Sequence, residues 1–167
     1  MTTDHPRDDI ERRVVAALDA AGVPYELLDC DPALADTAAF SEHYGYPVGM
    51  SANTIVVASK REPKVYAACV VLAPRRLDVN NTVKRRMGVN KASFATAEET
   101  TELTGMQIGG VTALALPPSM PLWVDGEVMR QEAVILGGGS RAMKVKVAPE
   151  VFNRIPGAEI VDRLYLD

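Results

Sequence analysis

The strongest constraint on the fold is a pair of apolar runs joined by a short polar segment. Residues 54–58 (Thr-Ile-Val-Val-Ala) form a compact β-branched run, which predicts a buried strand. Residues 60–64 (Lys-Arg-Glu-Pro-Lys) are polar, and residues 65–73 are apolar again before Pro74 ends the run. This pattern predicts a β-hairpin over residues 54–73.

Helical patterns flank this hairpin. Ile10, Val14 and Leu18 recur every four positions, and Gly22 follows, so a helix is expected from Asp9 onward. We expect further helices over residues 36–44, 78–87, 96–104 and 148–154, the third beginning with a Thr96–Glu99 capping box. Short strands are expected over residues 25–29, 91–95, 122–124, 133–136, 144–147 and 159–161. No regular βαβ alternation is present, so the sequence predicts a mixed α/β fold rather than a doubly wound sheet.

Length and composition predict one globular domain. The chain has 167 residues, of which 47% are hydrophobic and 24% charged. Residues 1–8 are polar and are expected to form a flexible tail, leaving residues 9–167 as a single domain. No apolar run approaches the roughly 20 residues that span a bilayer, and no secretion signal is evident. We therefore expect a cytoplasmic protein without a membrane partner.

The few cysteine and histidine residues argue against a metal centre. The sequence has two of each and no H-E-x-x-H motif, so we expect no metal and no organic cofactor. Cys30 and Cys69 are far apart and are expected to be unreactive packing residues. His43 lacks evident catalytic partners, which favours a surface or packing role.

Two glycine-rich segments are the main candidates for chemistry. Consecutive glycines at Gly109 and Gly110 allow main-chain N–H groups to converge on an oxyanion or a phosphate. A plain turn is the alternative. Residues 137–141 (Gly-Gly-Gly-Ser-Arg) could surround an anion with N–H, hydroxyl and guanidinium groups, or could form a flexible hairpin tip.

The net charge limits how nucleic acid could bind. Eighteen Lys and Arg residues against 22 Asp and Glu residues give a net charge of −4, which opposes binding through bulk charge. The densest basic cluster comprises Lys84, Arg85, Arg86 and Lys91. It is either a solvated helix face or a local binding patch for phosphates.

Taken together, the order and spacing of several short motifs resemble one known family. The motifs lie at residues 23–26 (Val-Pro-Tyr-Glu), 51–57 (Ser-Ala-Asn-Thr-Ile-Val-Val), 76–78 (Arg-Leu-Asp), 95–99 (Ala-Thr-Ala-Glu-Glu), 103–105 (Leu-Thr-Gly), 109–111 (Gly-Gly-Val), 124–125 (Val-Asp) and 137–141. Over residues 23–156 the chain resembles the YbaK-like family, which includes the editing domain inserted in bacterial prolyl-tRNA synthetases.

The resemblance implies a fold, an activity and a set of site residues. The implied fold is a compact, barrel-like mixed β-sheet flanked by helices. The implied activity is hydrolysis of the ester that joins a wrongly chosen amino acid to its tRNA, so a mischarged aminoacyl-tRNA is the expected partner, with an aminoacyl-tRNA synthetase as a second. The catalytic loop implied by the resemblance comprises Gly109, Gly110, Val111, Thr112 and Ala113. The implied substrate-binding residues are Tyr25, Asn53, Thr54, Asp125, Gly138, Gly139, Ser140 and Arg141.

Two residues depart from the family pattern. Asn53 occupies the position of a family lysine, and Ala113 occupies the position of the proline in the family's G-x-x-x-P loop. Asparagine brings no positive charge, and loss of proline leaves the loop less preorganised. Besides a free-standing deacylase, two alternatives therefore stay open. One is a module that binds aminoacyl-tRNA ends, an aminoacyl nucleotide or a protein partner without hydrolysis, and the other is a structural or interaction domain with no small ligand.

Overall fold

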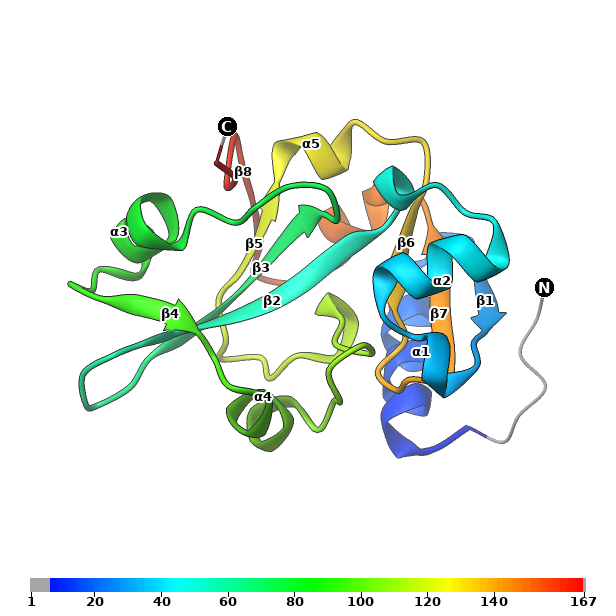
Figure 1. Cartoon of the computed structure of the whole chain (residues 1–167), viewed down its shortest axis with the longest axis horizontal. Coiled ribbons are helices and arrows are strands. Elements are labelled where there is room, and N and C mark those ends of the chain that lie inside the picture. Colours follow the sequence, from blue (N-terminus) through cyan, green and yellow to red (C-terminus); the bar gives the residue numbers. More distant parts are fainter. Residues whose placement is uncertain (1–6, 167) are drawn as a thin grey trace.

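The strands form two sheets in a computed structural model that describes residues 7–166 (Figure 1). The three-stranded sheet is antiparallel and has the order β1 (Tyr25–Asp29), β7 (Met143–Val147), β6 (Val134–Gly137). The five-stranded sheet has the order β4 (Ala92–Phe94), β2 (Ala52–Ser59), β3 (Tyr66–Leu72), β5 (Leu122–Asp125), β8 (Ala158–Val161). Its pairs β3–β5 and β5–β8 are parallel, while the others are antiparallel, so the predicted mixed sheet and the β2–β3 hairpin are confirmed.

Helices and helical turns connect the strands. The α-helices are α1 (Asp9–Ala21), α2 (Thr37–Tyr44), α3 (Lys84–Met87), α4 (Ala97–Thr104) and α5 (Gly126–Met129). The short turns are η1 (Pro32–Leu34), η2 (Val48–Met50), η3 (Val79–Val83), η4 (Ala113–Ala115) and η5 (Pro149–Arg154). The helix expected over residues 78–87 is a π-helical turn, η3, continued by α3, and α5 was not predicted.

The predicted helix ends are set by local caps. Asp8 and Glu11 form a capping box at the start of α1, and Thr96 and Glu99 form another at the start of α4. Gly22 ends α1 in the left-handed conformation that glycine adopts without strain. Of the predicted tail, residues 1–6 lie outside the described residues.

The expected barrel-like sheet is wrong in one respect, because the two sheets do not close. They meet at a single parallel bridge between Ser51 and Ile135, after which β6 diverges from β2. Farther along the same edge of β2, β4 pairs with it from Val57 onward. Among the described strands, β1 and β8 remain unpaired with each other, although closure would require that pair. The edge of β2 between the bridge and β4 is therefore open.

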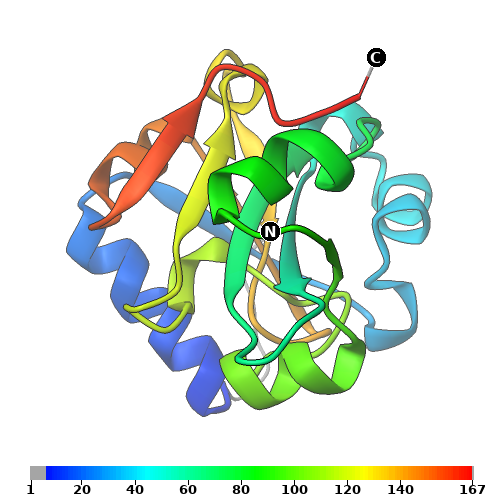
Figure 2. The ribbon, with the colours of Figure 1, turned by 90° about the vertical axis from the view of Figure 1, so that its left-hand side faces the viewer.

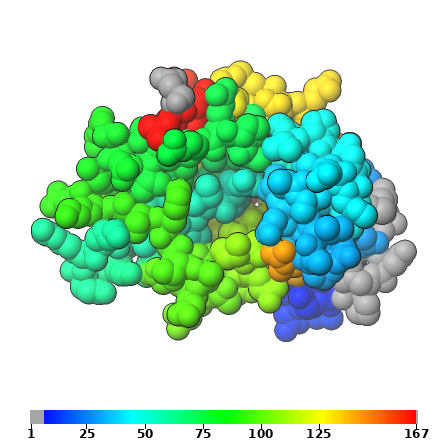
Figure 3. All heavy atoms as spheres, in the orientation of Figure 1, coloured from blue at the N-terminus to red at the C-terminus, as the bar shows by residue number. Residues whose placement is uncertain are grey.

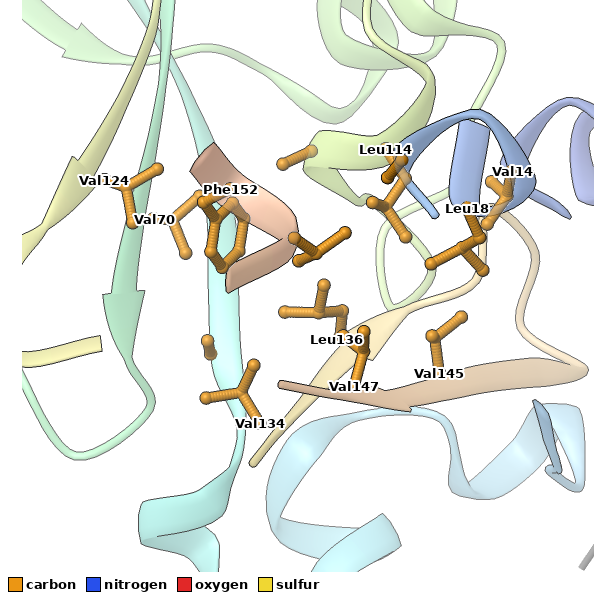
Figure 4. Packing of buried hydrophobic residues seen from close by; sticks show 14 of the residues in the cluster. Val14, Leu18, Val70, Leu114, Val124, Val134, Leu136, Val145, Val147 and Phe152 are labelled. Atoms are coloured by element: carbon orange, nitrogen blue, oxygen red, sulfur yellow. The ribbon is translucent and has the colours of Figure 1, made fainter. Parts of the chain in front are cut away.

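The five-stranded sheet is buried on both faces, which explains the continuous apolar run of β3. One face carries Val70 and Val124, which pack with Phe152 against α1 and the three-stranded sheet (Figure 4). The other face carries Cys69 and Val71, which are covered by η3, α3 and the C-terminal segment (Figure 2). A strand covered on both faces reads as an unbroken apolar sequence instead of an alternating one. Within the described residues, no helix is long and apolar enough to cross a membrane.

Candidate functional site

The main cavity lies where the two sheets diverge, along the open edge of β2. Its volume is about 330 Å³. Figure 3 shows it as a hollow between the segment around α2 and the segments around β4 and α4. The lining residues are Ala35, Asp36, Thr37, Phe40, Ser51, Ala52, Asn53, Thr54, Ile55, Val56, Phe94, Ala95, Thr100, Ile108, Gly109, Val111, Ile135, Leu136, Gly137 and Lys144.

The open edge of β2 directs main-chain polar groups into this cavity. On the β3 side, the Ser51 C=O accepts from the Ala73 N–H and the Ser59 N–H donates to the Val65 C=O, at the two ends of the ladder. The alternation of an antiparallel ladder therefore turns the N–H and C=O groups of Thr54 to the opposite edge. Beside Thr54, Asn53 accepts a hydrogen bond through Oδ1 from Thr37 Oγ1 at 3.0 Å. The β2 wall of the cavity therefore presents a fixed amide side chain and an unpaired stretch of backbone.

Two cations hold the carbonyl groups of the glycine loop on the opposite wall. Lys144 Nζ donates to the Gly109 C=O at 2.7 Å, and Arg141 Nη1 donates to the Ile108 C=O at 2.8 Å. Gly109 has a φ of +93°, a conformation that other residues rarely adopt. These bonds fix the two successive peptide planes before and after Gly109.

The same geometry decides which N–H groups of the loop are free. The Gly110 N–H donates to the Gln107 C=O at 2.8 Å, so it is already satisfied within the loop. Within residues 7–166, no acceptor meets the N–H of Gly109 or that of Val111, and both residues line the cavity. These two N–H groups are the donors available to a developing negative charge.

The second glycine-rich segment supports the first from behind. The Gly139 N–H donates to the Gly110 C=O at 2.7 Å. A Cβ atom on Gly110 would lie 2.4 Å from the Ser140 C=O, and one on Gly137 would lie 2.4 Å from the Val111 C=O. The two backbones are thus in contact, and that contact requires glycine on both sides.

The polar groups of the second segment bond inside the protein. Ser140 Oγ donates to the buried carboxylate of Glu11 and accepts from the Ala142 N–H at 3.0 Å. Arg141 also donates to the Pro32 C=O at 2.9 Å and lies 3.2 Å from Asp36. Of residues 137–141, Gly137 alone lines the cavity, so the structure places Gly138, Gly139, Ser140 and Arg141 outside it.

Five other predicted site residues also lie outside the cavity lining, namely Gly110, described above, and Tyr25, Asp125, Thr112 and Ala113. Tyr25 donates its hydroxyl to Asp19 at 2.7 Å. Asp125 is fully buried, caps α5 and accepts from the Leu164 N–H at 2.7 Å, while burial raises the pKa of its carboxyl group. Thr112 and Ala113 are buried, Ala113 within the main core. The structure therefore brings together Asn53, Thr54, Gly109 and Val111, with Gly110 directly behind them.

Lys144 was not among the predicted site residues. The family lysine is replaced by Asn53, but Lys144 on β7 lines the same cavity. Lys144 is only 7% exposed, and its Nζ lies 5.7 Å from the centre of the Phe40 ring. Burial lowers the pKa of its ammonium group. Two lysines alternate with apolar residues along β7, and this was the available signal, although it does not distinguish Lys144 from Lys146.

The mouth of the cavity carries exposed apolar side chains. Phe94 on β4 is 60% exposed and Ile108 is 50% exposed, the two highest values among the large hydrophobic residues in the described part of the chain. Both line the same cavity. Exposed apolar groups beside a cavity are typical of a surface that receives a ligand.

The basic cluster, the two cysteines and His43 lie outside the cavity lining. Arg86 pairs with Glu159 at 2.6 Å and lies over the Trp123 ring, so the predicted basic cluster retains Lys84, Arg85 and Lys91 without ion pairs in residues 7–166.

Burial raises the pKa of the thiols of Cys30 and Cys69, that of Cys69 to about 12. His43 lies edge-on to Tyr44, outside the cavity lining. Within the described chain, no group of three or more His, Cys, Asp or Glu side chains could hold a metal ion.

Comparison with known proteins gives a consistent family and fold. The family model described as "Aminoacyl-tRNA editing domain" matches residues 31–155. A curated protein of Enterococcus faecalis (strain ATCC 700802 / V583), named "Putative Cys-tRNA(Pro)/Cys-tRNA(Cys) deacylase EbsC", is 22% identical over 122 residues, which are 73% of each chain.

Two solved structures have a similar fold. One is described as a "putative trans-editing enzyme for prolyl tRNA synthetase"; it has a TM-score of 0.80 and 23% identity, covering 97% of this chain and 100% of that chain. The other, hypothetical protein APE2540, has a TM-score of 0.78 and 26% identity, covering 89% of this chain and 97% of that chain.

Proposed function

The chain belongs to the aminoacyl-tRNA editing domain family, and from this membership we propose that it is a free-standing deacylase of mischarged aminoacyl-tRNA. The observation that supports this proposal most is the shared cavity of Asn53, Thr54, Gly109 and Val111. These residues come from the two motifs that the family pattern associates with the ester. Editing by hydrolysis is needed where binding alone separates similar amino acids poorly.

The proposed reaction is ester hydrolysis without a covalent enzyme intermediate. A water oxygen attacks the carbonyl carbon, and the carbonyl oxygen becomes a negatively charged oxyanion. The N–H groups of Gly109 and Val111 donate to that oxyanion. The bond to the ribose oxygen then breaks, the ribose oxygen takes a proton, and the amino acid and the tRNA are released.

The surroundings of the cavity suggest where the tRNA end lies. The apolar side chains of Phe94 and Ile108 at the mouth suit the terminal nucleobase, because bases stack on exposed aromatic rings. Lys84, Arg85 and Lys91 would contact phosphates farther along the tRNA. A synthetase partner and a cytoplasmic location belong to the same proposal.

A second candidate function is binding of an aminoacyl-tRNA end without hydrolysis. It is favoured by the Asn53 side chain, which brings no charge and is engaged with Thr37. Under this hypothesis the cavity would hold the ester while leaving it intact.

One experiment separates these two functions. The purified chain is incubated with a panel of mischarged tRNAs, and ester loss is followed with time. A deacylase shortens the lifetime of at least one ester, and Gly49→Ala keeps this activity because a Cβ atom there meets nothing within 4 Å. Binding of the charged tRNA with an unchanged ester lifetime would support the second candidate and contradict the first.

A further inference from the structure

Lys144 is a buried cation without a carboxylate counterpart. The residue is only 7% exposed, yet no ion pair joins its side chain to an acidic residue within residues 7–166. The titratable and charged groups that act on it are Cys30, Arg141 and Asp36. Asp36 is itself paired with Arg141 and is largely exposed. Burying an unpaired ammonium is strongly unfavourable, so proteins seldom retain one without a partner.

The contact with the Gly109 C=O satisfies only part of this group. An ammonium has three N–H donors, and the carbonyl takes one of them. The side chain lines the cavity, so its other donors are next to the space that a ligand would fill. Gly109 also has an N–H group that meets no acceptor in the described chain. The same residue therefore offers a main-chain donor close to the Lys144 ammonium.

Lys146 shows that the buried position is not a general property of this strand. It lies two residues farther along β7, on the same side of the strand, and is half-buried. Its Nζ lies 5.9 Å from the Tyr46 ring, and it is absent from the cavity lining. The two lysines are thus a matched pair, one directed into the cavity and one beside it.

We propose that the Lys144 ammonium binds the carbonyl oxygen of the aminoacyl ester during hydrolysis, and then the carboxylate of the released amino acid. This inference rests on the proposed function. It assigns the cavity a carboxylate-binding position formed by the Lys144 ammonium and the adjacent loop. The charge of the ligand supplies the counterpart that the folded protein lacks.

The kinetic test compares the two lysines. Lys144→Met should lower kcat about 10²- to 10³-fold, the loss typical of one oxyanion donor, and Lys144→Gln should recover part of the rate with a neutral donor. Lys146→Met should leave the rate unchanged. An unchanged kcat in a folded Lys144→Met protein would overturn the inference while leaving the deacylase intact.

A binding test is independent of hydrolysis and of the folding of the Met variant. The natural protein is labelled at lysine Cε, the Lys144 signal is assigned with Lys144→Arg, and acetate and L-alanine are titrated by NMR. We expect the Lys144 signal to move and the pKa of its ammonium to rise, because a bound carboxylate favours the charged form. The Lys146 signal should stay in place. If Lys144 moves but no tRNA ester is hydrolysed, the carboxylate position stands and the deacylase proposal fails. If Lys144 does not move, the inference fails.

Discussion

The two glycine-rich segments touch each other, yet their polar groups have different partners. In the first segment, Gly109 and Val111 line the cavity, and their N–H groups meet no acceptor within the described residues. In the second, the Gly139 N–H bonds to Gly110, and Ser140 and Arg141 bond to other parts of the protein. Glycine allows both backbones to approach closely, whereas the partner of each N–H group determines which segment can act on a ligand.

Forcing the segments apart should have the largest effect on activity. Gly110→Ala places a Cβ atom 2.4 Å from the Ser140 C=O, so the loop must move. We expect kcat/KM for a mischarged tRNA to fall about 10²- to 10³-fold, and overpacking to lower the free energy of unfolding by about 1–3 kcal/mol. Deacylation assays and urea unfolding measure both, with Gly49→Ala as the control. Natural activity in Gly110→Ala would show that the loop position does not matter.

Removing a cation that holds the loop should have the next largest effect. Arg141→Met leaves the Ile108 C=O and the Pro32 C=O without their charged donor. Hydrogen bonds to charged groups contribute about 1.5–3 kcal/mol, so the expected loss in kcat is roughly 10- to 160-fold. Arg12→Met, which removes an exposed ion pair with Asp9, is the matched control. Equal rates for the two variants would exclude a positioning role for Arg141.

The opposite wall should contribute less than the loop. Asn53→Ala removes the acceptor for Thr37 but leaves the β2 backbone in place. Loss of one neutral hydrogen bond, about 0.5–1.5 kcal/mol, predicts a roughly three- to twelve-fold decrease in kcat/KM. Steady-state kinetics measures this decrease. A loss as large as that of Gly110→Ala would move the principal chemistry from the loop to the β2 wall.

A substitution in the supporting segment should change stability but not chemistry. Gly139 has a φ of +94°, so Gly139→Ala should cost about 1–2 kcal/mol of folding free energy. The N–H that bonds to Gly110 is retained, and activity per folded molecule should stay within about twofold of the natural protein. Chemical unfolding combined with kinetics below the unfolding transition tests this separation. A specific loss of kcat would place Gly139 among the functional residues.

Local features of this fold could be predicted from the sequence, while the arrangement of the site could not. The capping box of Thr96 and Glu99 involves residues three positions apart, so it was predicted from the sequence; the box of Asp8 and Glu11 has the same spacing, but residue 8 was assigned to the tail. The cavity depends on the bridge between Ser51 and Ile135, which are distant in sequence.

Distant contacts also explain why some residues were wrongly predicted to lie in the site. Asp125 is buried and accepts a hydrogen bond from the Leu164 N–H, 39 positions away, and no local motif reveals this contact. Alternation along β7 places Lys144 and Lys146 on the same side, but it does not tell which one enters a cavity. Whether a polar residue lies in the cavity therefore depends on its tertiary contacts, which its local motif does not specify.

The most direct test of the proposed site is NMR of the main-chain amides with a bound, non-hydrolysable 3′-aminoacylamido-adenosine. We predict that the N–H signals of Gly109 and Val111 shift on binding, together with that of Thr54 on the facing wall. The Gly139 N–H signal, already bonded to Gly110, should move least. Shifts confined to Gly138, Gly139 and Ser140, with Gly109 and Val111 unchanged, would contradict the assignment of the cavity as the site of ester binding.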